Sequence, residues 1–308
     1  MYPLLLRPII KNYIWGGERL ISEYGFKCDS PPAAEAWVLA CRENGVNTVL
    51  NGKYRGMPLS EIPGVDAESF PPLVKLIDAA DDLSVQVHPS AECAARHPGD
   101  SEKTEMWYVI DCAEGSSLIL GFNSEYEKRG IEEIEKGFLR GDFDKLLRRV
   151  SVHPGDVFFV EPGTVHAIGR GILLAEVQQN SDTTYRVYDY GRTGADGRPR
   201  ELHIDKALDA VRCAAKGGVV SDTARTEPYG RVRTLSCDKF SSDVIDLDGD
   251  APASRADVMR CLLILSGDVS VTGGGERLEM KKGDCAYVPA GCETSVSGKG
   301  RIMISRPA

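Results

Sequence analysis

Four side chains with metal-binding chemistry lie in three short segments of the chain. Gln86 and His88 fall in Leu-Ser-Val-Gln-Val-His-Pro, Glu105 in Lys-Thr-Glu-Met-Trp-Tyr-Val-Ile, and His166 ends Glu-Pro-Gly-Thr-Val-His. Side chains at positions i and i+2 of a strand share a face, so Gln86 and His88 point the same way. Two imidazoles, one carboxylate and one amide oxygen suit zinc or another borderline divalent ion. The alternative for each histidine is simple burial with hydrogen-bond partners.

Strands must position these side chains, because period-two alternation dominates the chain. Strands are predicted at residues 36–40, 48–50, 83–88, 105–110, 117–120, 157–160, 171–178 and 184–188. Helical spacing occurs in few places, with Ser90, Asp142 and Asp205 as candidate N-caps. The pattern predicts an all-β protein with a few short helices.

Composition narrows the class of protein. A chain of 308 residues is long enough for two domains, and a formal net charge of −9 argues against general affinity for nucleic acid or anionic membranes. No apolar run approaches the ~20 residues of a membrane span. Nine scattered cysteines indicate reduced thiols and a cytoplasmic protein. We expect a monomer or a weak homo-oligomer.

Two segments repeat at an offset of 128 residues. Gly-Asp-Val-Phe-Phe-Val-Glu-Pro-Gly at 155–163 aligns with Gly-Asp-Cys-Ala-Tyr-Val-Pro-Ala-Gly at 283–291. Extending the alignment places Thr294 opposite His166, so the second copy lacks that ligand. The interpretation is two domains, a metal-binding one at 1–220 and a degenerate one without metal ligands at 221–308.

The first copy resembles the second motif of the cupin superfamily, Gly-x5-Pro-x-Gly-x2-His. Gly155, Gly163 and His166 fit the motif, with the proline displaced by one position to Pro162. Cupins are double-stranded β-helix barrels, so the resemblance implies two cupin-like jelly-roll barrels.

Five ordered motifs sharpen the resemblance. They are Asn-Tyr-Ile-Trp-Gly-Gly at 12–17, Ser-Val-Gln-Val-His-Pro at 84–89, Lys-Thr-Glu-Met-Trp at 103–107, Pro-Gly-Thr-Val-His-Ala at 162–167, and Glu-Val-Gln-Gln-Asn-Ser-Asp-Thr-Thr-Tyr-Arg-Val-Tyr-Asp-Tyr-Gly-Arg at 176–192. Together they are similar to type I mannose-6-phosphate isomerases in their short bacterial form. The resemblance implies that the helical insertion domain of longer members is reduced to a short excursion at about 125–150.

The resemblance also implies the site residues. One Zn²⁺ per chain would be held by Gln86, His88, Glu105 and His166. The implied catalytic residues are Arg186, Lys103, Asp182 and Glu176, and the implied substrate-binding residues are Trp15, Ser84, Lys103 and Arg186.

The residues themselves leave some roles open. Lys103 shares the ligand face if its strand extends that far, where an ammonium would attract an anionic substrate; the alternative is a solvated surface lysine. Arg186 shares a face with Thr184 and Tyr188, so it is either catalytic or paired structurally. The proton-transferring base is Glu176, Asp182 or a metal-bound hydroxide.

The functional hypothesis is interconversion of D-mannose 6-phosphate and D-fructose 6-phosphate through a cis-enediol, with a small phosphosugar as partner. A catalytically inactive metal-containing cupin that binds or senses sugars is the first alternative. A cupin oxygenase is the second, and Gln86 at the first ligand position argues against it.

Overall fold

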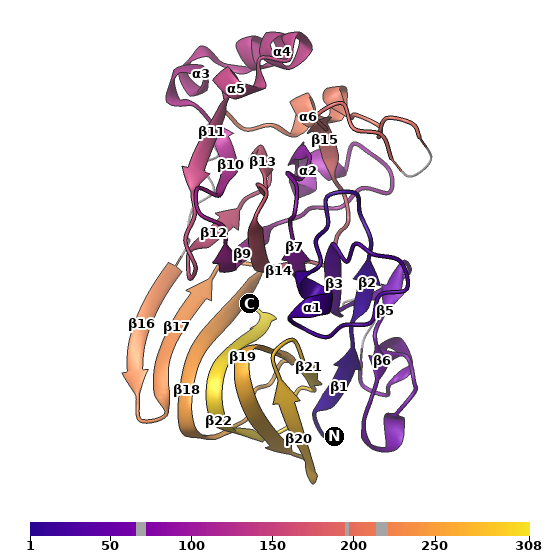
Figure 1. Ribbon diagram of the computed structural model, residues 1–308, viewed down its shortest axis with the longest axis vertical. Helices are drawn as coiled ribbons and strands as arrows, with labels where there is room; N and C mark the ends of the chain where they lie inside the picture. Colours follow the sequence, from indigo (N-terminus) through magenta and orange to yellow (C-terminus); the bar gives the residue numbers. More distant parts are fainter. Residues whose placement is uncertain (66–71, 195–196, 214–220) are drawn as a thin grey trace.

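Short strands make up most of the computed structural model, which describes residues 1–65, 72–194, 197–213 and 221–308 (Figure 1). The expected mostly-β fold with short helices is confirmed. Within the described part of the chain, none of the helices combines the length and apolarity that a membrane crossing requires.

Two sheets enclose the expected metal-binding side chains. Within the described residues, one sheet runs in the order β12 (Val157–Val160), β9 (Glu105–Cys112), β14 (Ile172–Gln179), β7 (Pro72–Asp78), β3 (Glu35–Leu39) and β2 (Ile9–Lys11). The other runs β11 (Leu147–Ser151), β10 (Ser117–Phe122), β13 (His166–Ala167), β8 (Val85–Val87) and β15 (Tyr185–Tyr188). A separate short hairpin pairs β4 (Cys41–Arg42) with β5 (Gly45–Val46).

A third sheet holds the C-terminal part of the chain. Its order is β16 (Ser221–Glu227), β17 (Gly230–Ser236), β18 (Phe240–Ser254), β22 (Thr294–Pro307), β19 (Arg260–Gly273), β21 (Cys285–Val288), β1 (Leu4–Arg7) and β6 (Thr48–Val49), with β20 (Glu276–Lys281) paired to β19. The N-terminal strand β1 therefore lies beside β21, in the lower half of Figure 1. The expected division into domains at 1–220 and 221–308 does not include this pairing, which joins a strand of the first range to the sheet of the second.

The helices are short and mostly cover one end of the molecule. They are α1 (Arg19–Ser22), α2 (Ala91–Ala94), α3 (Ser124–Arg129), α4 (Ile131–Arg140), α5 (Phe143–Leu146) and α6 (Ile204–Ala210), with 3₁₀ turns at Gly52–Tyr54 and Leu59–Glu61. The helices α3, α4 and α5 occupy the stretch expected to hold the short helical excursion and lie at the top of Figure 1.

The three predicted N-caps have different outcomes. Ser90 caps α2, because its hydroxyl accepts a hydrogen bond from the Cys93 amide at 3.2 Å. Asp142 is the N-cap residue of α5, but its side chain makes no capping hydrogen bond. The prediction for Asp205 is wrong: His203 precedes α6, and Asp205 lies within its first turn.

Side chains on the two faces of β9 pack into two different hydrophobic cores. Trp107 and Val109 belong to the buried cluster between the two N-terminal sheets, whereas Met106 and Tyr108 belong to a cluster shared with strands of the C-terminal sheet, such as Leu263. Glu105 has the same parity as Trp107, so its side chain joins the interior of the N-terminal barrel.

Candidate active site

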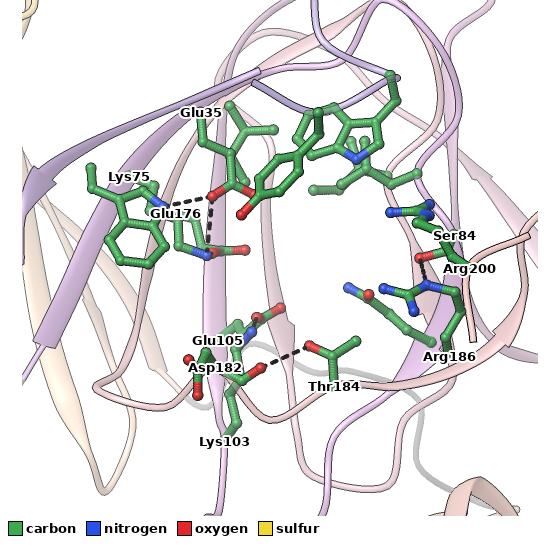
Figure 2. A pocket seen from close by; sticks show the side chains of 17 residues that line it. Glu35, Lys75, Ser84, Lys103, Glu105, Glu176, Asp182, Thr184, Arg186 and Arg200 are labelled. Atoms are coloured by element: carbon green, nitrogen blue, oxygen red, sulfur yellow. Dashed lines mark hydrogen bonds and ion pairs between the residues drawn. The ribbon is translucent and has the colours of Figure 1, made fainter. Parts of the chain in front are cut away.

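A cavity of about 310 Å³ opens in the mouth of the N-terminal barrel (Figure 2). Its lining carries four acids, Glu35, Glu105, Glu176 and Asp182, and four bases, Lys75, Lys103, Arg186 and Arg200. The formal charges of these eight groups cancel, although the whole chain carries −9. A bound divalent cation would therefore make the cavity positive.

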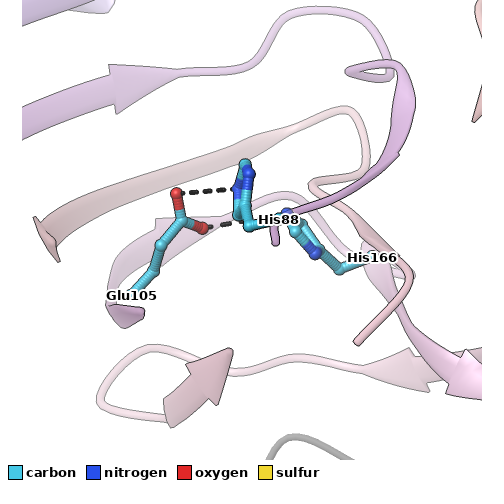
Figure 3. Close-up of side chains that lie close together, drawn as sticks. All are labelled: His88, Glu105 and His166. Carbon is cyan, nitrogen blue, oxygen red and sulfur yellow. Dashed lines mark ion pairs between the residues drawn. The ribbon is translucent and has the colours of Figure 1, made fainter. Parts of the chain in front are cut away.

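Three of the four predicted ligands form a compact cluster (Figure 3), and Glu105 of this cluster lines the cavity. His88 Nε2 lies 3.2 Å from Glu105 Oε1, and His166 Nε2 lies 3.8 Å from Glu105 Oε2. One donor atom from each side chain falls within 4.8 Å of the others, and all three residues are buried. These spacings allow a single ion to contact all three groups.

Backbone carbonyls fix the orientation of both imidazoles. His88 Nδ1 lies 2.8 Å from the Thr183 carbonyl oxygen, and His166 Nδ1 lies 2.9 Å from that of Thr164. A carbonyl can only accept, so each Nδ1 must carry the proton, and each Nε2 is left with a lone pair. Metal-binding histidines are oriented in this way by their outer-shell partners.

The donor set fits a divalent metal. Among the described residues, His88 Nε2 and Glu105 Oε2 are buried polar atoms without a hydrogen-bond partner. Such orphaned atoms are costly unless an ion or water satisfies them. Gln86 joins the cluster through its amide nitrogen, 3.3 Å from His166 Nε2. A half-turn of this amide would present its oxygen, which is the atom that a cation requires.

The electrostatics of the cluster favour the protonation states that a metal needs. Burial, reinforced by the Lys103 ammonium, lowers the pKa of His88 to about 3. Burial likewise lowers the pKa of His166. Burial opposes ionisation of Glu105, but Lys103 and His88 outweigh it and hold the pKa of this carboxyl well below its usual value. At neutral pH the cluster consists of two neutral imidazoles and one carboxylate.

Lys103 contacts the metal cluster directly. β9 begins at Glu105, so the strand does not extend to Lys103, although that extension is the condition for Lys103 to share the ligand face. The buried ammonium nevertheless lies 2.7 Å from Glu105 Oε1. The alternative of a solvated surface lysine is wrong.

A second charged row lies on the sheet that also carries Glu105. Lys75 Nζ lies 2.8 Å from Glu176 Oε1 and 3.8 Å from Glu35 Oε2, and all three side chains are buried. Trp107 donates its indole N–H to Glu176 at 2.9 Å, and Trp37 donates to Glu35 at 2.7 Å. Burial would lower the pKa of Lys75, but Glu176 and Glu35 raise it, so the ammonium stays charged.

Guanidinium groups gather on the other side of the cavity, as Figure 2 shows. Arg186 donates through Nε to the Ser84 hydroxyl at 3.3 Å and through Nη1 to the Glu201 carbonyl at 2.9 Å. No carboxylate forms an ion pair with Arg186 in the part of the chain that the structure describes. Arg200, by contrast, is held by Asp189, with its Nε 2.7 Å from Oδ2. Arg186 is thus a half-buried cation facing the cavity without a counter-ion.

The remaining predicted residues occupy the rim or the wall. Trp15 and Ser84 are buried and line the cavity. Asp182 lies at the exposed rim, where it forms an ion pair with Arg42 at 2.9 Å. Arg192, the last residue of the 176–192 motif, is not among the residues that line the cavity, and its Nη2 lies 2.7 Å from Asp189 Oδ1.

Sequence reasoning missed Glu35, Lys75 and Arg200. A lysine inside the apolar run Pro-Leu-Val-Lys-Leu-Ile and a glutamate inside Ala-Ala-Glu-Ala-Trp-Val-Leu were available signals, because charges in fully buried strands need partners. Arg200 lies in a loop after β15, and no local pattern distinguishes it.

Comparison with known proteins identifies the family. The profile of phosphomannose isomerase type I, catalytic domain, matches residues 4–115, and that of mannose-6-phosphate isomerase, cupin domain, matches residues 232–307. The chain is 38% identical to mannose-6-phosphate isomerase ManA of Bacillus subtilis (strain 168) over 316 aligned positions, covering 98% of each protein. The chain belongs to the type I mannose-6-phosphate isomerase family.

Solved structures of mannose-6-phosphate isomerases share the fold. The crystal structure of the mannose 6-phosphate isomerase from Bacillus subtilis matches with a TM-score of 0.92 at 33% identity, covering 99% of both chains. A mannose 6-phosphate isomerase bound with zinc and yttrium matches with a TM-score of 0.76 at 18% identity, again over 99% of both chains. The expected cupin architecture is confirmed by these matches and by the cupin profile.

Proposed function

We propose that this chain interconverts D-mannose 6-phosphate and D-fructose 6-phosphate. The reaction is an aldose–ketose isomerisation, in which a proton moves between C2 and C1 through a cis-enediol. One observation carries the proposal: Glu105 of the His88–Glu105–His166 cluster, which suits a metal, lines the same cavity as Arg186, a guanidinium without an ion-pair partner among the described residues. An isomerase of phosphosugars needs both features, because one end of its substrate reacts and the other end is a dianion.

Type I phosphomannose isomerases are metal-dependent, and we assign Zn²⁺ as the ion of this chain. Gln86, His88, Glu105 and His166 would hold it, with nitrogen and oxygen donors that zinc accepts. When bound, the ion would act as a Lewis acid on the sugar oxygens. The zinc-bound relative with the same fold supports the choice of metal.

Arg186 and Arg200 would receive the phosphate together with the Ser84 hydroxyl. Burial and, after it, the neighbouring Arg200 lower the pKa of Arg186, as expected for two guanidiniums that lie close enough to repel each other. A dianion between them would relieve that repulsion. The phosphate is remote from C1 and C2, so its binding energy would orient the sugar at the reacting end.

Glu176 is our choice for the proton-transferring group. It is 3% exposed and lines the cavity, whereas Asp182 is exposed and committed to Arg42. Burial and the nearby Glu105 carboxylate raise the pKa of Glu176, which favours proton uptake by one of its carboxylate oxygens. Trp107 donates to Oε2 and the Lys75 ammonium lies beside Oε1, so the carboxylate has a fixed orientation.

Lys103 would act beside Glu105. Its ammonium is close enough to stabilise negative charge that develops on the sugar oxygens, and it also keeps Glu105 ionised. The alternative of an inactive sugar-binding cupin has no support from the curated relatives, which are named as isomerases.

The test is a coupled assay of the purified protein with mannose 6-phosphate and with free mannose at equal zinc loading. We expect isomerisation of the phosphosugar, loss of activity on chelation, recovery with Zn²⁺, and a kcat/KM for free mannose that is lower by several orders of magnitude. Equal kcat/KM for the two sugars would reject the phosphosugar assignment. Absence of turnover on both, with metal and fold intact, would reject the isomerase.

A further inference from the structure

The C-terminal sheet encloses a second cavity, of about 330 Å³. It is lined by residues of β16, β17, β18, β19 and β22, the orange and yellow strands of Figure 1, and of the segment that follows β18. Four arginines face it, Arg225, Arg255, Arg260 and Arg306, against a single aspartate, Asp243. An excess of three positive charges around one small cavity is unexpected in a chain of net charge −9.

The backbone of the two barrels is equivalent around these cavities. Gly155 donates its amide proton to the Val109 carbonyl at 2.8 Å, and Gly283 donates to Ile264 at 2.8 Å. Further along, Gly163 donates to His88 at 2.8 Å, and Gly291 donates to Ala256 at 2.7 Å. The repeat seen in the sequence therefore extends to strands whose sequences do not align.

Strand register then identifies the counterparts of the metal cluster. Glu105 pairs with Val160, and Arg260 pairs with Val288, which is the repeat equivalent of Val160. Likewise His166 pairs with Gln86, and Thr294 pairs with Ser254. The positions of Gln86, His88, Glu105 and His166 are thus occupied by Ser254, Ala256, Arg260 and Thr294, and all four of these residues line the second cavity.

Arg260 places a fixed cation where the first barrel has its metal-binding carboxylate. Arg260 is 6% exposed, and its guanidinium donates to Ser254 Oγ at 2.8 Å, to Thr294 Oγ1 at 2.8 Å and to the Cys292 carbonyl at 2.8 Å. All of these acceptors are neutral. In the described part of the chain its Nε has no hydrogen-bond partner, and no carboxylate pairs with it. Burying a cation without a counter-ion is costly.

The cavity mouth adds a further cation. Arg255 is exposed and lines the cavity, and no described carboxylate forms an ion pair with it. Arg306, by contrast, is paired with Asp243 at 2.8 Å, and Arg225 with Glu227 at 2.9 Å. Arg255 and Arg260 are therefore the two cations of this cavity whose charge is not compensated.

We propose that the second barrel is a binding site for a small organic anion. A phosphate or carboxylate head would be held between Arg260 and Arg255. The body of the ligand would contact the apolar part of the wall, which includes Val232, Ile245, Val296 and Ile302. This apolar part of the wall favours a ligand with an apolar body over a sugar phosphate, because the hydroxyl groups of a sugar would find few polar partners there. The site does not depend on the function proposed for the first barrel.

The test is isothermal titration calorimetry of the zinc-loaded protein with phenyl phosphate, benzoate and inorganic phosphate, and with benzyl alcohol as a neutral control. We expect phenyl phosphate or benzoate to bind, and inorganic phosphate to bind more weakly than phenyl phosphate because it lacks the apolar body. The two aromatic anions distinguish a phosphate head from a carboxylate head. Binding should persist in Arg186→Ala, which weakens any competing phosphate site in the first barrel.

Two exposed arginines give a matched pair of variants. Arg255→Ala should weaken binding roughly tenfold or more, the scale of one charge-assisted contact. Arg231→Ala removes the same charge from an exposed position on β17 outside the cavity lining, and should change affinity little. Neither variant should alter isomerase activity. Lack of heat with both aromatic anions at millimolar concentration, equal affinity in the two variants, or binding that disappears in Arg186→Ala would each overturn the proposal.

Discussion

Among the described residues, Lys75 is the only cation that forms ion pairs with the buried carboxylates of Glu176 and Glu35, and Lys75→Met removes it. Lys75, Glu176 and Glu35 are 7%, 3% and 8% exposed, so water compensates little of the loss. Methionine matches the length of lysine, and the substitution therefore tests charge rather than packing. The variant keeps all four expected metal ligands.

The expected cost follows from burial and distance. Removing one partner of a buried ion pair costs about 3–5 kcal/mol, because the other charge is left without a partner. At an effective dielectric constant of about 20, the gross attraction is about 6 kcal/mol for the 2.8 Å contact with Glu176 and about 4 kcal/mol for the 3.8 Å contact with Glu35. Glu176 is therefore the main partner, and adding Glu176→Gln to Lys75→Met should recover more stability than adding Glu35→Gln.

Urea unfolding followed by tryptophan fluorescence measures this loss. All three tryptophans, Trp15, Trp37 and Trp107, lie in the N-terminal barrel, so their emission reports on the affected region. Every protein should be measured after chelation, so that metal release does not contribute. The matched control is Lys136→Met on α4, which breaks an exposed ion pair with Glu133 and should leave the midpoint nearly unchanged.

The loss should also depend on pH. Without Lys75, the folded-state pKa of Glu176 rises further above the unfolded value of about 4.3. A carboxyl with a raised folded pKa destabilises the fold when ionised, so the deficit should grow as pH rises and shrink as pH falls toward 4.3. A deficit equal to that of Lys136→Met, or one that does not change with pH, would refute the reasoning.

Three further outcomes follow from the geometry. Arg186→Ala should keep its zinc and lose roughly a hundredfold or more in kcat/KM for mannose 6-phosphate; an unchanged kcat/KM would remove Arg186 from the phosphate site, and loss of zinc would make it structural. Elemental analysis should find about one zinc per chain, and none in the double variant His88→Ala with His166→Ala; two ions per chain would contradict a single site. Ser90→Ala removes the α2 cap and should lower the free energy of unfolding by about 1 kcal/mol without changing kcat, which urea titration would check.

The sequence determined the local features of the site. Alternation in Val-Gln-Val-His was sufficient to put Gln86 and His88 on one face, because the side-chain period of a strand is two whatever surrounds it. Ser90 could also be recognised as a helix cap from the local sequence, because capping depends on neighbouring backbone amides. The repeat of the Gly-Asp turn likewise predicted that the second barrel lacks the histidine ligand.

Tertiary structure decided which distant side chains meet. Lys75, Glu35 and Arg200 joined the cavity because β7 and β3 pair beside β14 and because a loop after β15 returns to its mouth. Nothing near β1 predicts its place beside β21. The equivalence of Arg260 with Glu105 could be recognised only from strand register, because it depends on the pairing of Arg260 with Val288. Local sequence sets the direction of each side chain, but pairing between strands, which depends on the packing of the whole core, sets its neighbours.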